Sequence, residues 1–238
     1  MTNLLAIETS SPTLSVALKK TNGRLHQATV RGFMKHAENL LPVIDRLLKK
    51  ERLKLQDIDA FLIGRGPGSF TGLRIGFATL KGFLAIRPKP CYGALSLDLI
   101  AAGISPRQHS NLTICLDARR GKLYTRSYRY FKGRWVPCGP SRVVLSGDMA
   151  AMLPQRSWVA GDGITKCAAL NAKQLSERYG TPKAATLIKL FETKNTLLKK
   201  LSHPREFLPA YLRHSEPEEK LAEAKKRGCP NTHHFQRS

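Results

Sequence analysis

The motif with the clearest capacity for chemistry is a glycine-rich segment, residues 64–72, which reads GRGPGSFTG. A short apolar run, 60–63, leads into it and a segment of helical length, 73–80, follows, so we expect a tight turn between a strand and a helix. Ser69 or Thr71 can cap that helix, and the amides of its first turn could then bind a phosphate. A turn that needs its glycines only for geometry is the alternative, because the Walker sequence, with Lys before Ser or Thr, is missing.

The seven histidines do not have the spacing of a metal site. Two His ligands on one face of a helix need positions i and i+4, and no pair in the sequence is spaced in this way. His36 stands alone where the first helix is expected to begin, so a cap or surface role is favoured over metal ligation. We therefore predict no metal ligand.

A nucleophilic mechanism has equally little support. The sequence contains no Gly-x-Ser-x-Gly elbow, and no Ser or Cys can be tied to a His from the sequence alone. Ser69 lies in a strand-to-helix turn, as such a nucleophile would, but Pro67 and Phe70 flank it and no base is identified. We predict no catalytic residue.

Composition indicates a globular, cytoplasmic protein. The chain has 238 residues, of which 42% are hydrophobic, and this length fits one large domain or two small ones. No apolar run approaches the length of a membrane span, and the N-terminus does not have the features of a signal peptide. The five cysteines are scattered without a C-x-x-C pair, so we expect reduced thiols, with Cys91 and Cys115 in the core.

The charge balance is strongly basic, because 40 Lys and Arg face 17 Asp and Glu, for a net charge of +23. The excess lies mostly before residue 214 and favours contact with nucleic acid or with an acidic protein. A general preference for basic residues on solvated faces is the alternative. No stretch interleaves basic residues with stacking aromatics, so a dedicated RNA-binding platform is not indicated.

The elements that must position these residues follow from hydrophobic periodicity and turn signals. In the first half we expect three meandering strands, then a helix, a strand, a helix, a short strand and a helix capped by Ser96, at residues 4–7, 14–18, 24–30, 36–50, 60–63, 72–85, 91–93 and 97–102. In the second half we expect a strand and its hairpin partner, a strand with a turn, and an amphipathic helix, at residues 112–116, 123–131, 158–163 and 184–199.

This order resembles the ribonuclease-H-like half of the actin/sugar-kinase/chaperone ATPase architecture. We therefore predict an α/β fold with two lobes, the first at residues 1–104 and a smaller second lobe at 105–213. The helix near 184–199 is expected to pack back on the first lobe. Residues 214–238 are charged and are expected to form a mobile tail.

Four segments together resemble the TsaB (YeaZ) family, which is the partner subunit in threonylcarbamoyladenosine synthesis on transfer RNA. The residues that carry the resemblance lie at 5–10, 64–76, 117–119 and 210–213. It implies a non-catalytic subunit that binds and activates a TsaD-like catalytic subunit. That partner moves a threonylcarbamoyl group to N6 of adenosine 37 in tRNAs that read codons beginning with A.

The resemblance also implies further partners, and the sequence departs from the family pattern at two points. A small TsaE-like P-loop ATPase would join the pair, and tRNA would be met through the complex or directly. This sequence has Glu8 where the family commonly has Asp, which weighs against a metal-linked phosphate role there. The basic balance and the tail after Arg213 also differ from the more acidic members.

Related ATPases wrap phosphates with a strand-turn-strand near the N-terminus, which implies a residual nucleotide site. Thr9, Ser10 and Ser11 supply hydroxyls in the corresponding turn, and Arg65 could bind a phosphate with two hydrogen bonds. Ordinary hydrogen bonding within the turn is the alternative. We expect no tightly bound cofactor, with ATP or ADP at the partner interface as the one exception.

Two arginines follow the strand 112–116. Arg119 and Arg120 stand at its end and are candidates for polar contact with a partner or with tRNA. A solvated strand end without such a role explains them equally well.

A partner interface is predicted on the helices 36–50 and 72–85. The second helix is apolar on almost every side, and its own sheet can cover only one side. Glycines and alanines four residues apart would let another helix approach, so we expect a four-helix bundle with a partner or with a second copy of the chain. The alternative is that the second lobe covers both helices. The predicted interface residues are Leu40, Leu41, Ile44, Leu47, Leu48, Gly72, Arg74, Ile75, Gly76, Thr79 and Leu80.

Two functions from different classes follow from the sequence. The first is the accessory subunit of a tRNA N6-adenosine threonylcarbamoyltransferase complex described above. The alternative is an enzyme in its own right, either ATP-dependent and kinase-like or a peptidase of the glycoprotease type.

Overall fold

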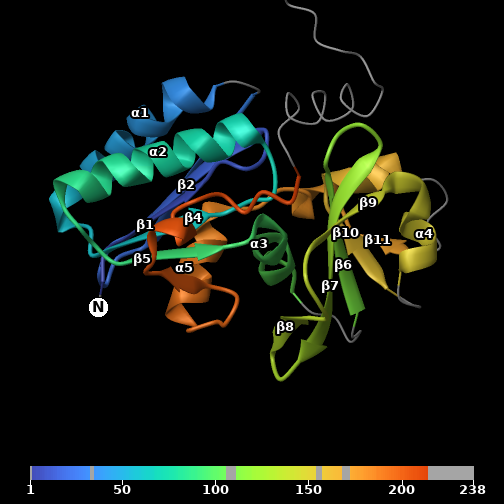
Figure 1. Ribbon diagram of the computed structural model, residues 1–238. Helices are drawn as coiled ribbons and strands as arrows, with labels where there is room; N and C mark the ends of the chain where they lie inside the picture. Colours follow the sequence, from blue (N-terminus) through green and yellow to red (C-terminus); the bar gives the residue numbers. More distant parts are fainter. Residues whose placement is uncertain (1, 33–34, 106–110, 154–156, 168–171, 214–238) are drawn as a thin grey trace, which may run out of the picture.

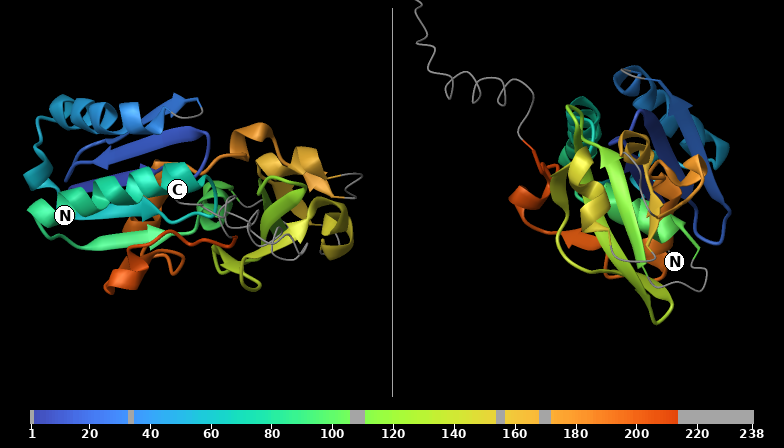
Figure 2. Two further views of the ribbon diagram at one scale, coloured as in Figure 1. Left: turned by 45° about the horizontal axis from the view of Figure 1, so that its top comes forward. Right: turned by 90° about the vertical axis from the view of Figure 1, so that its right-hand side faces the viewer.

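Two six-stranded sheets form two lobes that lie side by side (Figures 1 and 2). The computed structural model describes residues 2–32, 35–105, 111–153, 157–167 and 172–213. The strand order is β12-β5-β4-β1-β2-β3 in the first sheet and β11-β10-β6-β7-β8 in the second, where β9 also pairs with β7.

The first sheet combines an antiparallel meander with parallel strands. Its strands are β1 (Leu4–Glu8), β2 (Thr13–Lys19), β3 (Leu25–Arg31), β4 (Ala60–Gly64), β5 (Cys91–Ala94) and β12 (Lys199–Leu201). β1, β2 and β3 pair antiparallel, whereas β1, β4 and β5 pair parallel. The first five strands confirm the predicted order, and the carboxyl ends of β1, β4 and β5 meet at the edge that faces the second lobe.

Helices cover both faces of this sheet. α1 (His36–Lys50) and α2 (Phe70–Ile86) lie on one face and α5 (Ala184–Glu192) lies on the other (Figure 1). β1 serves both, because its side chains alternate: Leu5 and Ile7 pack toward α1 and α2, whereas Leu4 and Ala6 pack toward α5. α3 (Ser96–Gly103) lies between the first sheet and the second lobe.

The last predicted helix is shorter than expected. It ends at Glu192 instead of residue 199, because Lys194 adopts a left-handed conformation (φ 47°) and the amide of Asn195 turns back to the carbonyl of Leu190. Leu197 keeps the helical periodicity of the sequence but packs into the core from a loop. The chain then adds β12 to the edge of the first sheet, antiparallel to β5.

The second lobe is built around a long hairpin. Its strands are β6 (Asn111–Asp117), β7 (Lys122–Phe131), β8 (Arg134–Pro137), β9 (Arg142–Leu145), β10 (Trp158–Ala160) and β11 (Lys173–Gln174), with the short helix α4 (Met149–Met152). β6, β7 and β10 confirm the predicted strands. The turn between β6 and β7 points at the first lobe and forms part of the candidate site. None of the helices in the described ranges is long and apolar enough to span a bilayer.

Candidate functional site

The glycine-rich segment packs the start of α2 against the turn between β1 and β2. The Ser69 amide donates to the carbonyl of Ser10 at 2.7 Å, and the Ser69 hydroxyl accepts from the amide of Gly72 at 3.2 Å. A side chain at Gly68 would clash with the carbonyl of Ser10, and one at Gly72 would clash with the carbonyl of Thr9. Ser69 is therefore the predicted helix cap, and these glycines serve the close approach of two backbone segments.

Glu8 fixes the other side of this contact. Its side chain is fully buried, and its carboxylate accepts from the amide of Ser10 at 2.6 Å and from the hydroxyl of Ser96 at 3.3 Å. Burial raises the pKa of Glu8, while the hydrogen bonds from Ser10 and Ser96 oppose that rise. The prediction that Ser96 caps α3 is wrong, because its hydroxyl is used by Glu8 and the cap residue is Leu95.

A cleft of about 510 Å³ lies between the two lobes. The turn after β1, His36 and the start of α2 form one wall; the end of β6, the β6–β7 turn and Asp162 form the other. The cleft thus brings two of the predicted phosphate contacts, Ser10 and Ser11, together with the two predicted polar contacts, Arg119 and Arg120. They come from positions more than 100 residues apart in the chain.

The other two predicted phosphate contacts lie elsewhere. Thr9 is buried against α2, where a side chain at Gly76 would come within 2.5 Å of the Thr9 hydroxyl oxygen. Arg65 lines a second cavity and is not part of the cleft wall. Ser11 does line the cleft, but its hydroxyl donates to the carbonyl of Thr13 at 2.9 Å, which is the hydrogen bonding of an ordinary turn. Phosphate binding at this turn stays a prediction.

The β6–β7 turn places its arginines through an unusual backbone. Arg119 and Arg120 both have positive φ, 64° and 50°. Asp117 holds the turn by accepting from the amide of Arg119 at 2.8 Å, and Asp162 accepts from the amide of Asp117 at 3.0 Å. The guanidinium of Arg213 donates to the carbonyl of Ala118. Arg213 therefore links the end of the described chain to the β6–β7 turn at the cleft.

The cleft does not contain a nucleophile paired with a base among its described residues. His36 is buried, contrary to the predicted cap or surface role, and its Nε2 lies 3.0 Å from the carbonyl oxygen of Ser11. Burial lowers the pKa of His36. The hydroxyl of Ser69 is occupied by the capping bond to Gly72. Within the ranges that the structure describes, no three His, Cys, Asp or Glu residues are grouped to hold a metal ion.

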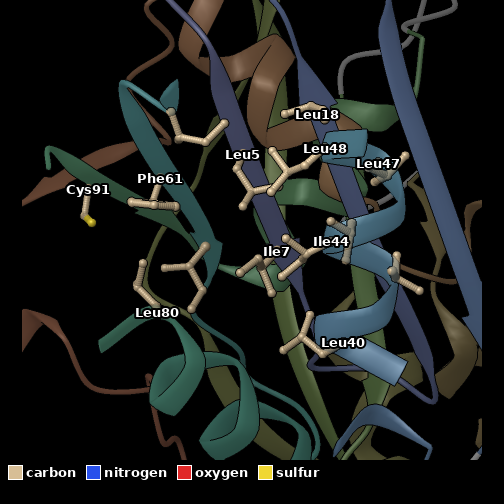
Figure 3. Packing of buried hydrophobic residues seen from close by; sticks show 14 of the residues in the cluster. Leu5, Ile7, Leu18, Leu40, Ile44, Leu47, Leu48, Phe61, Leu80 and Cys91 are labelled. Atoms are coloured by element: carbon tan, nitrogen blue, oxygen red, sulfur yellow. The ribbon is translucent and has the colours of Figure 1, made fainter. Parts of the chain in front are cut away.

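The predicted partner interface needs the largest correction. Leu40, Ile44, Leu47 and Leu48 point from α1 onto the strands of the chain's own sheet, where they meet Leu5, Ile7 and Leu18 (Figure 3). Leu80 of α2 belongs to the same cluster. All five are between 1% and 7% exposed, so they are core residues and not a surface for a partner.

The glycines of α2 are likewise either buried against the chain itself or exposed. Gly72 and Gly76 let α2 approach Thr9 of its own chain and do not face outward. Gly82 is exposed, and a side chain there would meet nothing within 4 Å. A charged side chain at Gly76 or Leu47 would therefore disturb the fold of the monomer itself, since both positions are buried.

A narrower surface remains on these helices, which we name the outer face. α1 and α2 lie side by side, and positions 74, 75, 78, 79 and 82 follow the helical repeat along one side of α2 (Figure 1). Leu41 of α1 is 54% exposed, Arg74, Ala78 and Gly82 are exposed, and Ile75 and Thr79 are half-buried. The outer face consists of Leu41, Arg74, Ile75, Ala78, Thr79 and Gly82.

One ion pair that joins the lobes was not anticipated. Asp98 on α3 accepts two hydrogen bonds from Arg126 of β7, at 2.8 and 3.1 Å, and one from the hydroxyl of Tyr128 at 2.6 Å. Burial raises the pKa of Asp98, against the charge of Arg126. A lone acidic residue in the apolar run 97–102 was the available signal, because such residues are buried only when they are paired.

Comparison with known proteins identifies the fold and the family of this chain. The family model described as TsaD, tRNA N6-adenosine threonylcarbamoyltransferase, matches residues 31–144. The chain is 30% identical over 154 residues to the tRNA threonylcarbamoyladenosine biosynthesis protein TsaB of Bacillus subtilis, covering 64% of this chain and 66% of that protein. It is 36% identical over 127 residues to TsaB of Haemophilus influenzae, covering 51% of each.

These matches span between half and two thirds of the curated relatives' length. A solved structure covers more: YeaZ from Pseudomonas aeruginosa superposes on 89% of this chain and 100% of its own with a TM-score of 0.74 at 26% identity. The two lobes thus have the predicted actin/sugar-kinase/chaperone ATPase-like fold. The chain belongs to the TsaB (YeaZ) family.

Proposed function

We propose that this chain is a non-catalytic subunit in the synthesis of N6-threonylcarbamoyladenosine on tRNA, where it binds and activates a TsaD-like catalytic subunit. The similarity to proteins named for that biosynthesis supports the pathway. The observation that carries the accessory role is the lack of catalytic groups. The sequence has no two histidines four residues apart, and the described cleft pairs no nucleophile with a base.

The outer face is the surface proposed for the catalytic subunit. Leu41 offers an exposed apolar side chain, and the small residues Ala78 and Gly82 allow a partner helix to come close. Burying an exposed leucine contributes roughly 1.5–3 kcal/mol before the costs of association. Because most of the predicted leucines are core residues, the interface depends more on close helix approach than on a large apolar patch.

The remaining partners follow from family membership and from charge. A TsaE-like P-loop ATPase, ATP or ADP at the partner interface, and tRNA are proposed on the family resemblance, and the net charge of +23 supports direct tRNA contact. The outer face could also join two copies of this chain when no catalytic subunit is present.

An independent enzyme is the second function considered, and the geometry gives it little support. A peptidase would need the hydroxyl of Ser69 free and near a base, but that hydroxyl caps α2 and His36 lies against the carbonyl of Ser11. Turnover of a peptide or of ATP by the purified chain would favour this alternative.

Reconstitution with one omitted component tests the proposal. The catalytic subunit, the P-loop ATPase, ATP, threonine, bicarbonate, the threonylcarbamoyl-adenylate synthase and unmodified tRNA are combined with and without this chain, and modified adenosine is measured by mass spectrometry. We expect modification only when this chain is present, and none from this chain without the catalytic subunit. Equal modification in its absence would contradict the proposal.

A further inference from the structure

A second cavity, of about 440 Å³, is lined by residues of both lobes. It opens beyond the carboxyl ends of β4 and β5, the edge at which open α/β sheets usually bind ligands. The two cavities share no lining residue. The charged side chains in the wall of the second cavity are Arg65, Asp98, Arg126 and Lys199.

The charges in this wall do not balance. Asp98 is the one carboxylate among the lining residues, and both its oxygens accept from Arg126, with a third bond from the hydroxyl of Tyr128. Asp98 and Arg126 therefore neutralise each other. Arg65 and Lys199 add two positive charges to the wall, and the carboxylate of Glu206, which is not among the lining residues, attracts that of Arg65.

Arg65 is held in place through its backbone, and the carboxylate of Glu206, which is not among the lining residues, attracts its guanidinium. The amide of Arg65 donates to the carbonyl of Ala94 at 2.8 Å, and its carbonyl accepts from the amide of Ala210 at 2.7 Å. Its Nε is buried and has no hydrogen-bond partner within the described residues, and burial lowers the pKa of its guanidinium. A buried donor without a partner is rare enough in folded proteins to require an explanation.

The backbone makes room for this arginine. Gly93 on β5 faces the stem of Arg65, and a side chain at Gly93 would lie 2.7 Å from its Cδ. The absence of a side chain at Gly93 thus lets Arg65 lie across the end of the sheet, at the wall of the cavity.

We propose that the second cavity binds a phosphate-type oxyanion, with Arg65 and Lys199 as its cationic ligands. The planar guanidinium of Arg65 matches two phosphate oxygens, and the ammonium of Lys199 adds a second positive charge to the same wall. The volume falls in the range of small-molecule sites, so the phosphate could belong to a small ligand or to one position of an RNA backbone. The proposal does not depend on pairing with a catalytic subunit.

Titration of the full chain with inorganic pyrophosphate at low ionic strength tests the site. We expect binding by the unmodified protein and a loss of at least about tenfold in affinity for Arg65→Gln, because a charge-assisted bond is removed. Lys199→Gln should weaken binding as well. The matched control is Arg129→Gln, which changes an exposed arginine on β7 outside the cavity and should bind as the unmodified protein does.

A second arm separates the two sources of the phosphate. If the oxyanion comes from RNA, Arg65→Gln should also weaken binding of an unmodified tRNA transcript, and pyrophosphate should compete with it; a small-molecule site would leave tRNA affinity unchanged. Lys199 is exposed, so Lys199→Gln keeps the test valid if Arg65→Gln fails to fold. Absence of pyrophosphate binding by the unmodified protein, or equal affinity in both cavity variants and the control, would overturn the proposal.

Discussion

At the scale of single residues, two glycines of α2 that look alike in the sequence have opposite roles. Gly72 lies against the carbonyl of Thr9, whereas Gly82 faces open space on the same helix. The sequence predicts glycine and alanine spacing suited to helix contact, but not which glycine meets the chain's own turn. That distinction depends on how α2 sits on the sheet, which is a tertiary property.

The two glycines give a matched pair of variants. Gly72→Ala should destabilise the protein by about 1–3 kcal/mol, because the added methyl group clashes with backbone that cannot move away cheaply. Gly82→Ala should stabilise it by up to about 1 kcal/mol, because alanine favours an exposed helix position. Urea unfolding of both variants measures the two effects. Equal destabilisation would show that the contact with Thr9 does not distinguish the two sites.

Glu8 makes stability depend on pH. Burial raises its pKa above the ordinary value of 4.5, so the folded protein holds this proton more tightly than the unfolded chain does. Its contribution to stability is therefore fully present below pH 4.5 and is lost as the pH rises through the folded pKa. Glu8→Gln carries no such proton, so we expect the stability of this variant relative to the unmodified protein to improve as the pH rises above 4.5 and to level off above the folded pKa.

Unfolding free energies across that pH range measure this difference. Glu38→Gln, at an exposed position of α1, controls for the loss of one negative charge. A difference between Glu8→Gln and the unmodified protein that stays constant with pH would show that the buried carboxyl is not the cause.

At the scale of elements, hydrophobic periodicity was sufficient to predict the first five strands of the first sheet and the bounds of α1. It was not sufficient to predict the function of α1's apolar residues. Leu40, Ile44 and Leu47 recur three or four residues apart, and such a stripe is only wide enough to cover the helix's own sheet. Leu41 is the one α1 leucine that lies outside this stripe. The predicted partner interface is therefore reduced to the narrower outer face.

The same helix allows a test of this division. Leu47→Ala should cost about 2–5 kcal/mol of stability, because it leaves a cavity in the core cluster between α1 and the first sheet. Leu41→Ala should change stability by less than about 0.5 kcal/mol, since that side chain is more than half exposed. Chemical unfolding of the two variants side by side checks the prediction, and a loss of similar size for both would contradict the assignment of Leu41 to the surface.

The helix predicted at residues 184–199 ends at Glu192, because a turn follows it. The apolar residues after Glu192 keep a helical spacing, but Lys194 and Asn195 turn the chain and bring β12 to the edge of the first sheet. Edge pairing between distant segments is a long-range contact that local periodicity does not contain.

At the scale of the whole molecule, the lobes meet around residues that are far apart in the chain. The cleft joins the turn after β1 to the β6–β7 turn, and the Asp98–Arg126 pair joins α3 to β7. The sequence pointed to Ser10, Ser11, Arg119 and Arg120 separately, but not to their common cleft. Asp98 and the second cavity were not anticipated, because each requires knowledge of which strand ends meet.

The net positive charge belongs to the whole molecule and not to one site. A net charge of +23 is spread over both lobes and is not confined to a single patch in the sequence. Long-range attraction to an anionic polymer would follow from it and would weaken as salt rises. Oxyanion binding at the second cavity, which Arg65 lines, would measure this attraction at one defined site.

The affinity of this chain for the TsaD-like catalytic subunit tests the central claim most directly. The double variant Leu41→Glu with Ala78→Glu places two charges on the outer face at exposed positions, so the monomer should stay folded. Phe131→Glu is the matched control, because Phe131 is 55% exposed, as Leu41 is at 54%, but lies on the second lobe. We predict that the double variant binds at least about a hundredfold more weakly while the control binds normally; unchanged affinity of the double variant, with unaltered unfolding, would contradict the account.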